Sequence, residues 1–333
     1  MSEPFPITAL EAARPPGANG PAALRLVPGE SPEEICLQLG GGAAKVLDAG
    51  GATLWKGTCA DGGAGPAFAR TPEALYCALP GGPVLRIAQE GGAMAVTGIA
   101  SAPVGLGTVG GAPWGIWQAA DDAPYRVGPL DAGEAAAIEA PAPDATAAGW
   151  GAVLSGCGGA PVLFQNDPRR GFRAHLHEDG AWRELTARGA YRHGLNALVF
   201  GAVPWDGGVA LAAGLGEGLR AALFGLASRD ELLHLRPDGA FDVLSGELRT
   251  SPHGLQVPRS PVRSPAMREM GDLAYPCAVG AHLAVALNRR GASALIFSAR
   301  PGEGLEAAAE APGRVLDMCE GDGGLCVLHA PGA

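Results

Sequence analysis

The sequence predicts an all-β fold assembled from repeated antiparallel units, on three observations. First, apolar runs and Gly- or Asp-rich turns return every 40 residues or so: Leu39-Gly40-Gly41-Gly42 is followed by Leu79-Pro80-Gly81-Gly82 and by a turn at Asp121-Asp122. Second, no long run has helical periodicity. Third, the glycines, 53 in all, lie between the apolar runs, where turns are expected. Repeated four-stranded units of this size indicate a β-propeller.

The first three units follow in order along the chain. Ala23–Val27 is a candidate N-terminal strand that precedes them. Ile35–Leu39 and Ala44–Leu47 flank the first glycine turn as a hairpin. Residues 74–98 repeat that pattern, and a third unit runs from Trp114 to Ile138. The short, turn-rich connections are those that antiparallel hairpins require.

The later units carry stronger turn signals. Val162–Leu185 contains Asp179-Gly180, and the next unit repeats this with Asp238-Gly239; glycine accepts the positive φ of such hairpin turns. The sixth unit covers His282–Ala308. The tail, Val315–Met318 and Leu325–His329, supplies two further strands. An N-terminal strand joining them would close the ring, which predicts seven blades in one domain, residues 1–333, with six blades as the alternative.

Some stretches interrupt the pattern. Residues 140–161 are expected to form a loop or an unusual inner strand. Residues 246–276 are rich in Pro and Arg and are expected to form a long inter-blade loop; loops of this length are often functional. Gly105–Gly110 matches GxGxxG, but no helix is evident after it, so it is expected to be a turn and not a dinucleotide site.

Composition excludes several function classes. The net charge is −10 with no basic block, which argues against nucleic-acid binding and against an anionic membrane as partner. No apolar run is long enough to span a membrane, and the N-terminus lacks the pattern of a secretory signal. The seven cysteines contain no CxxC pair and are expected to be reduced thiols. We therefore expect a cytoplasmic protein.

Three segments carry a resemblance to known proteins: Glu231–Gly246, Gly254–Pro261 and Gly313–Val327. The first contains an Asp-Gly turn followed by an aromatic residue, and it resembles a blade of soluble β-propeller repeat proteins of a poorly characterised type. The second is similar to an inter-blade loop of such propellers, and the third to a last blade. The resemblance implies architecture and no particular activity. The Trp-Asp dipeptide typical of WD40 blades occurs at Trp205-Asp206 and does not recur.

His175 and His177 are the candidate metal ligands. They lie two positions apart in a predicted strand, so alternation places both imidazoles on one face. No third ligand follows at a suitable spacing, and a solvated strand face is the interpretation we favour.

Two polar segments are candidate ligand-binding sites. Arg192 and His193 lie on a connection between units, which in a propeller can reach the central mouth, but an ordinary polar loop is the interpretation we favour. Arg249, His253 and Tyr275 belong to the long loop 246–276, which could cap that mouth. Arginines there could bind a carboxylate or phosphate group through paired hydrogen bonds.

The predicted function is a binding or scaffold propeller that docks a protein partner or a small polar or anionic ligand at one face. The alternative is an enzyme, a hydrolase, lyase or isomerase, that acts on an anionic metabolite in the central pocket. In that case Arg249, His253 and His193 would be the first residues to test, and a metal-dependent form would use His175 and His177. The sequence does not identify a cofactor.

Overall fold

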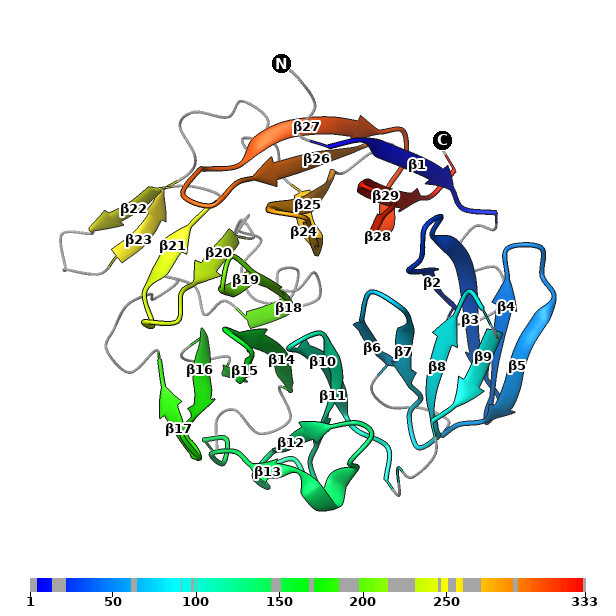
Figure 1. Cartoon of the computed structure of the whole chain (residues 1–333), viewed down its shortest axis with the longest axis horizontal. Coiled ribbons are helices and arrows are strands. Elements are labelled where there is room, and N and C mark those ends of the chain that lie inside the picture. The colour runs from blue at the N-terminus through cyan, green and yellow to red at the C-terminus, as the bar shows by residue number, and fades with distance from the viewer. Residues whose placement is uncertain are drawn as a thin grey trace.

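The computed structural model describes residues 5–13, 22–60, 65–90, 92–96, 99, 101–144, 151–167, 171–185, 198–214, 231–244, 247–250, 256–259, 271–289 and 293–331. Within these residues the fold is all-β, and the one helical element is a 3-10 turn, η1 (Glu134–Ala136). No helix of this part of the chain is long and apolar enough to cross a membrane. The sheets stand around a common centre, which makes the fold a β-propeller (Figure 1).

Four strands in sequence order make up each repeating unit, with antiparallel neighbours. The strands of the first three units are β2 (Ala22–Val27), β3 (Glu33–Gly40), β4 (Ala43–Asp48), β5 (Thr53–Thr58), β6 (Ala67–Arg70), β7 (Leu75–Ala78), β8 (Val84–Ala88), β9 (Gly92–Ala95), β10 (Gly105–Val109), β11 (Ala112–Trp117), β12 (Arg126–Pro129) and β13 (Ile138–Glu139). Those of the next units are β14 (Ala152–Cys157), β15 (Ala160–Asp167), β16 (Gly171–Glu178), β17 (Ala181–Glu184), β18 (Leu198–Trp205), β19 (Gly208–Gly214), β20 (Glu231–Leu235), β21 (Phe241–Val243), β24 (Gly271–Val279), β25 (His282–Arg289), β26 (Ala294–Ala299) and β27 (Glu306–Ala311).

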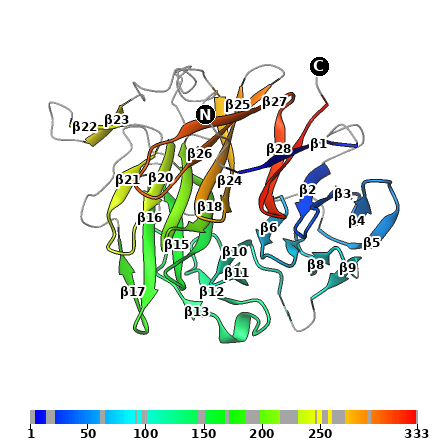
Figure 2. The ribbon, with the colours of Figure 1, turned by 45° about the horizontal axis from the view of Figure 1, so that its top comes forward.

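Both ends of the chain meet in a three-stranded sheet of β1 (Ile7–Glu11), β29 (Gly324–His329) and β28 (Val315–Gly321). β1 runs parallel to β29 in the register Ile7 to Leu325, and Figure 2 shows it beside the tail strands. The strand expected at Ala23–Val27 is confirmed as β2, the first strand of the β2–β5 unit, where it pairs with β3. The N-terminal strand that joins the tail is β1, which precedes it in the chain.

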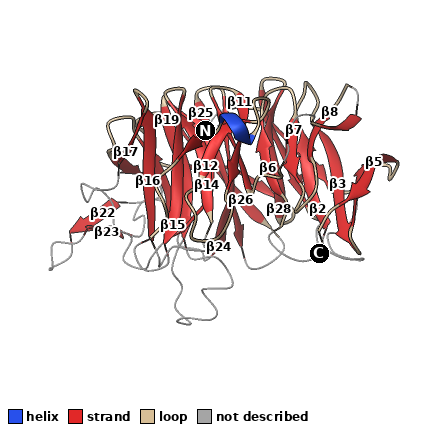
Figure 3. Ribbon diagram, turned by 90° about the horizontal axis from the view of Figure 1, so that it is seen from below, coloured by secondary structure: helices blue, strands red, loops and turns tan. Residues whose placement is uncertain are grey.

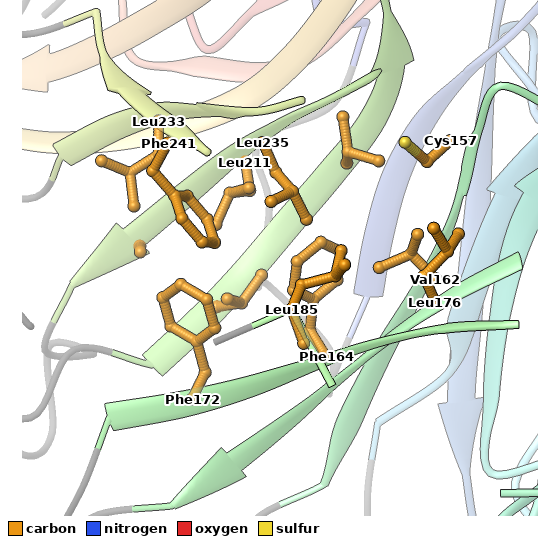
Figure 4. Close-up of a cluster of buried hydrophobic side chains, with 14 residues drawn as sticks. Cys157, Val162, Phe164, Phe172, Leu176, Leu185, Leu211, Leu233, Leu235 and Phe241 are labelled. Atoms are coloured by element: carbon orange, nitrogen blue, oxygen red, sulfur yellow. The ribbon is translucent and has the colours of Figure 1, made fainter. Parts of the chain in front are cut away.

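Apolar clusters fill the spaces between successive units. The cluster between the β14–β17 and β18–β21 units stacks Phe164, Phe172 and Phe241 edge to face, with ring centroids 6.0 Å apart in each contact (Figure 4). Comparable clusters lie between the other neighbouring units, and one joins the β28–β29 strands to the β2–β5 unit. Both faces of each sheet are therefore covered, and the sheets stand side by side (Figure 3).

The innermost strands approach each other closely at β10 and β14. Thr108 and Ser155 form a parallel bridge that merges their two units into one eight-stranded sheet. A Cβ on Gly107 would lie 2.2 Å from the carbonyl oxygen of Leu154, so only glycine fits there. The turn expected at Gly105–Gly110 was therefore wrong: Gly105–Val109 is strand, and Gly107 is there for backbone contact. Residues 140–161 were expected to form a loop or an unusual inner strand, and Ala152–Cys157 forms the inner strand β14.

Part of the expected loop 246–276 is strand in the structure. β22 (Glu247–Thr250) and β23 (Gln256–Arg259) pair as a separate two-stranded hairpin, which stands outside the ring of sheets in Figures 1 and 2. β24 begins within the same segment, at Gly271. Residues 251–255 and 260–270 lie outside the described part.

Candidate functional site

A polar group of side chains covers one face of the β15–β17 strands. The register pairs Gln165 with Arg173 across β15 and β16, and His175 with Glu184 across β16 and β17. Paired residues point to the same face of a sheet, so these four side chains lie together. We call them, with Trp182 and with Asp144 from the segment after β13, the His175 cluster.

The His175 cluster faces the neighbouring β10–β13 unit. Gln165 Nε2 donates to the carbonyl oxygen of Pro141 at 2.6 Å, and Trp182 Nε1 donates to that of Glu139 at 2.8 Å. Leu163, on the same strand as Gln165, packs with Ile116 and Val127 in the apolar cluster between the two units. The space between these units is thus lined partly by apolar and partly by polar side chains.

Arg173 is held by two carboxylates. Its Nε and Nη2 donate to the two oxygens of Glu184 at 3.1 and 2.6 Å, and its Nη1 lies 3.3 Å from Asp144 Oδ1. The hydrogen bonds to Glu184 are the main cause that raises the pKa of Arg173 above its usual value. All three guanidinium nitrogens are engaged, so Arg173 braces β16 and β17 against the segment that follows β13.

Two buried polar atoms of the cluster have no hydrogen-bond partner in the described part of the protein. Gln165 and His175 are each 2% exposed. The Gln165 amide nitrogen is bonded to Pro141, but its Oε1 is unpartnered, as is Nε2 of His175. A buried polar atom without a partner costs about 1–3 kcal/mol, so such atoms mark a site that can gain from a ligand.

Burial keeps His175 neutral. Burial, the largest cause, and the positive charge of Arg173 together lower the pKa of His175 from 6.5 to about 4, against the smaller opposite effects of Glu184 and Asp144. At neutral pH the ring therefore carries one N–H donor and one nitrogen acceptor. His177 lies two residues on, partly exposed, with its ring 5.0 Å from that of Trp182.

The sequence placed His175 and His177 on one face as candidate metal ligands. Both lie on β16, where one is buried and the other contacts Trp182. Among the described residues, no group of three or more His, Cys, Asp or Glu side chains is arranged to hold a metal ion. Metal binding through these two histidines stays a prediction.

The other candidate ligand-binding residues are not brought together by the described structure. Arg192, His193 and His253 lie outside the described residues. Arg249 lies on β22, opposite Val257, and Tyr275 lies on β24.

Sequence reasoning missed most of the His175 cluster, namely Gln165, Arg173, Trp182, Glu184 and Asp144. A signal was present in Phe172–Leu176, which alternates apolar Phe172, Ala174 and Leu176 with polar Arg173 and His175. That pattern is typical of a solvated face, and only the tertiary structure shows that the polar face lies against another unit.

A second polar group, around Arg70 and Asp317, joins three units near the centre. Arg70, at the end of β6, forms an ion pair with Asp317 on β28 and donates to the carbonyl oxygens of Met318 at 2.7 Å and Leu26 at 3.1 Å. Asp317 Oδ2 also accepts from the N–H of Leu26 at 2.8 Å. Because these groups bond mainly to one another and to backbone, we interpret them as a structural brace.

No protein family matches the chain in sequence, and no curated protein matches it. The chain is similar in structure to the fucose-specific lectin of Aleuria aurantia, with a TM-score of 0.49 and 10% identity over 87% of this chain and 96% of that one. It is similar to U3-55K, with a TM-score of 0.49 and 12% identity over 94% and 89%, and to TolB of Acinetobacter baumannii, with a TM-score of 0.42 and 10% identity over 87% and 65%. TM-scores and sequence identities this low support no conclusion about function. The β-propeller architecture rests on the sheets themselves, and function has to be argued from the side chains.

Proposed function

We propose that this chain is a seven-bladed propeller that binds a small polar ligand at the His175 cluster. In this proposal the six four-stranded units are blades, and the sheet of β1, β29 and β28 is the seventh, closing blade. The apolar clusters between successive units, including those on both sides of the three-stranded sheet, support that count. The ligand site then lies between the third blade, β10–β13, and the fourth, β14–β17.

The unpartnered atoms of Gln165 and His175 carry the proposal. Unpartnered buried atoms also occur elsewhere, at Arg70, Ser155, His234 and His282, but in the His175 cluster two of them lie on one face of adjacent strands. In the His175 cluster these groups are held in place by ordered neighbours: the Gln165 amide nitrogen by Pro141, and the floor around His175 by the bidentate Arg173–Glu184 pair. Polar atoms fixed in position without a partner are the arrangement of a preorganised binding site.

The rim of the cluster is accessible from solvent. The side chains of Arg173 and Glu184 are 27% and 26% exposed, and Trp182 is partly exposed. In this proposal the ligand enters past a rim of one aromatic and several charged groups and binds at the buried Gln165 and His175. This combination of polar anchors and an aromatic wall is typical of small-molecule sites.

The experiment is a thermal-shift screen with small polar molecules that include neutral, anionic and cationic compounds. We expect some compounds to raise the Tm of the wild type, because binding to the folded state stabilises it. Gln165→Met, which keeps the side-chain length and removes Oε1 together with the amide nitrogen that bonds to Pro141, should abolish that shift. The matched control is Arg183→Ala, whose ion pair with Glu178 lies on the same two strands and is about half-exposed.

Two results would contradict the proposal. One is a screen in which no compound raises the Tm of the wild type. The other is a compound that raises the Tm of wild type and Gln165→Met equally, since binding would then lie elsewhere. Circular dichroism of each variant confirms that it has folded.

A further inference from the structure

We infer that the ligand of the His175 cluster is a neutral molecule with neighbouring hydroxyl groups, a polyol or a monosaccharide, and not an anion. The inference rests on the proposed binding function and names the chemistry of its ligand.

Arg173 is not placed to capture an anion. Its three nitrogens already face Glu184 and Asp144, at distances from 2.6 to 3.3 Å. Two of the five guanidinium N–H groups, one each on Nη1 and Nη2, are not used by these contacts, but a carboxylate or phosphate bound to them would lie beside Glu184 and Asp144, where like charges repel. The charge of Arg173 is therefore already balanced by two carboxylates, and an anionic ligand gains little from it.

A cationic ligand is disfavoured at the floor of the cluster. The same burial that keeps His175 uncharged penalises any other charge brought to its Nε2, and the nearby Arg173 charge acts in the same direction, against the smaller opposite effects of Glu184 and Asp144. Neutral ligand groups avoid both penalties. The floor of the site consequently selects against charge of either sign.

The two unpartnered atoms define which neutral group fits. Gln165 Oε1 can only accept a hydrogen bond, whereas Nε2 of a neutral histidine donates or accepts according to its tautomer. A hydroxyl group is both donor and acceptor, so it satisfies either atom in either tautomer. Gln165 and His175 are diagonal neighbours on adjacent strands, a separation of about 7 Å, which one small molecule with two or more hydroxyls can span.

Trp182 supplies the apolar wall that such a molecule needs. Its indole N–H is anchored to the carbonyl oxygen of Glu139, which fixes the ring at the edge of the cluster. The ring is partly exposed and contacts His177. A cyclic polyol presents C–H groups on its face and hydroxyls at its edge, so it can pack on Trp182 while its hydroxyls reach the floor.

The test compares three sets of probes on the full chain by saturation-transfer NMR and titration calorimetry. The first set contains neutral monosaccharides and cyclitols, the second their uronates and monophosphates, and the third amino sugars. We expect members of the neutral set to bind the wild type and Arg183→Ala with equal Kd. Gln165→Met should raise that Kd about tenfold or more, the effect of one hydrogen bond to a buried acceptor. Trp182→Leu should weaken binding as well, without affecting the hydrogen-bonding floor.

The outcomes separate this inference from the proposed function. If the anionic or the cationic set binds in a way that depends on Gln165, and neutral probes do not bind, the inferred ligand class is wrong. The proposed binding site would still be supported. Neutral probes that bind Gln165→Met as well as the wild type also overturn the inference. If no set binds and the wider thermal-shift screen also finds no ligand, the proposed function fails together with it.

Discussion

The side-chain amide of Asn288 holds the backbone of Val315 through two hydrogen bonds. Nδ2 of Asn288, on β25, donates to the Val315 carbonyl oxygen at 3.0 Å, and its Oδ1 accepts from the Val315 N–H at 2.8 Å. Asn166 on β15 makes the same two bonds to Val199 on β18, also at 3.0 and 2.8 Å. In both places an asparagine on the second strand of one unit fixes the first strand of the next.

Replacing Asn288 by alanine should destabilise the protein by about 2–4 kcal/mol, because it removes two hydrogen bonds and leaves a buried N–H and carbonyl unpaired. Urea unfolding measures the change. Gln118→Ala is the control: its amide bonds to the carbonyl oxygens of Asp121 and Ala123 within an exposed turn, and its loss should cost about 0.5 kcal/mol. Equal losses in the two variants would show that the Asn288 bonds do not brace the units.

Breaking the Arg70–Asp317 pair from one side should be more damaging than removing both charges. Arg70→Met leaves Asp317, almost fully buried, without its cation, which we expect to cost about 3–5 kcal/mol. Adding Asp317→Leu should recover part of that loss. A double-mutant cycle from unfolding free energies gives the coupling. Purely additive losses would refute the paired brace.

The stability of the protein should fall as the pH drops from about 6.5 to about 4, in part through His175. Its pKa is lowered from 6.5 to about 4 in the folded state, so in this interval the unfolded chain binds the proton and the folded chain does not. The contribution of His175 to the free energy of unfolding is present in full above pH 6.5 and is lost progressively toward pH 4. Its upper limit is about 3 kcal/mol. His234, whose pKa is also lowered by burial, acts in the same direction.

Unfolding free energies measured across this pH range test the effect. In His175→Gln the slope between pH 6.5 and 4 should be shallower than in the wild type. His177→Gln serves as the comparison on the same strand, because His177 is partly exposed. An unchanged slope in His175→Gln would mean that His175 titrates alike in the folded and unfolded chains.

Gly107→Ala should strongly destabilise the contact between β10 and β14. The added Cβ would lie 2.2 Å from a backbone oxygen of Leu154, and the backbone cannot move away as a flexible side chain would. Gly40→Ala is the control, since a Cβ there meets nothing within 4 Å. We expect a loss of at least about 2 kcal/mol for the first and little change for the second, measured by thermal unfolding. Similar Tm values would show that the inner strands can separate without cost.

The hairpins of the fold could be predicted from the sequence. Ile35–Leu39 and Ala44–Leu47 lie within β3 and β4, and the Asp179-Gly180 turn joins β16 to β17 with positive φ at both residues. Local turn chemistry and alternation determine these hairpins, so sequence reveals them. The inner strands β6 and β10 carry no such turn or alternation signal, because backbone contacts with neighbouring units determine which residues fit there.

The candidate site was predictable only in part, for the same reason. His175 and His177 share a strand, so their common face followed from spacing alone. Gln165 and Arg173 acquire their roles from Pro141 and Asp144, which belong to a segment of another unit. Contacts between side chains of different units follow no periodicity in the sequence. They can be identified only from the tertiary structure.

The parallel pairing of β1 with β29 has a consequence for the order of assembly. During translation Ile7–Glu11 leaves the ribosome long before Gly324–His329 is made, so it stays without its partner while the hairpins between them fold locally. The sheet that contains β1 is therefore the last to form. A nascent chain stalled before β29 would display β1 as an unpaired strand, open to pairing with the β29 of another copy.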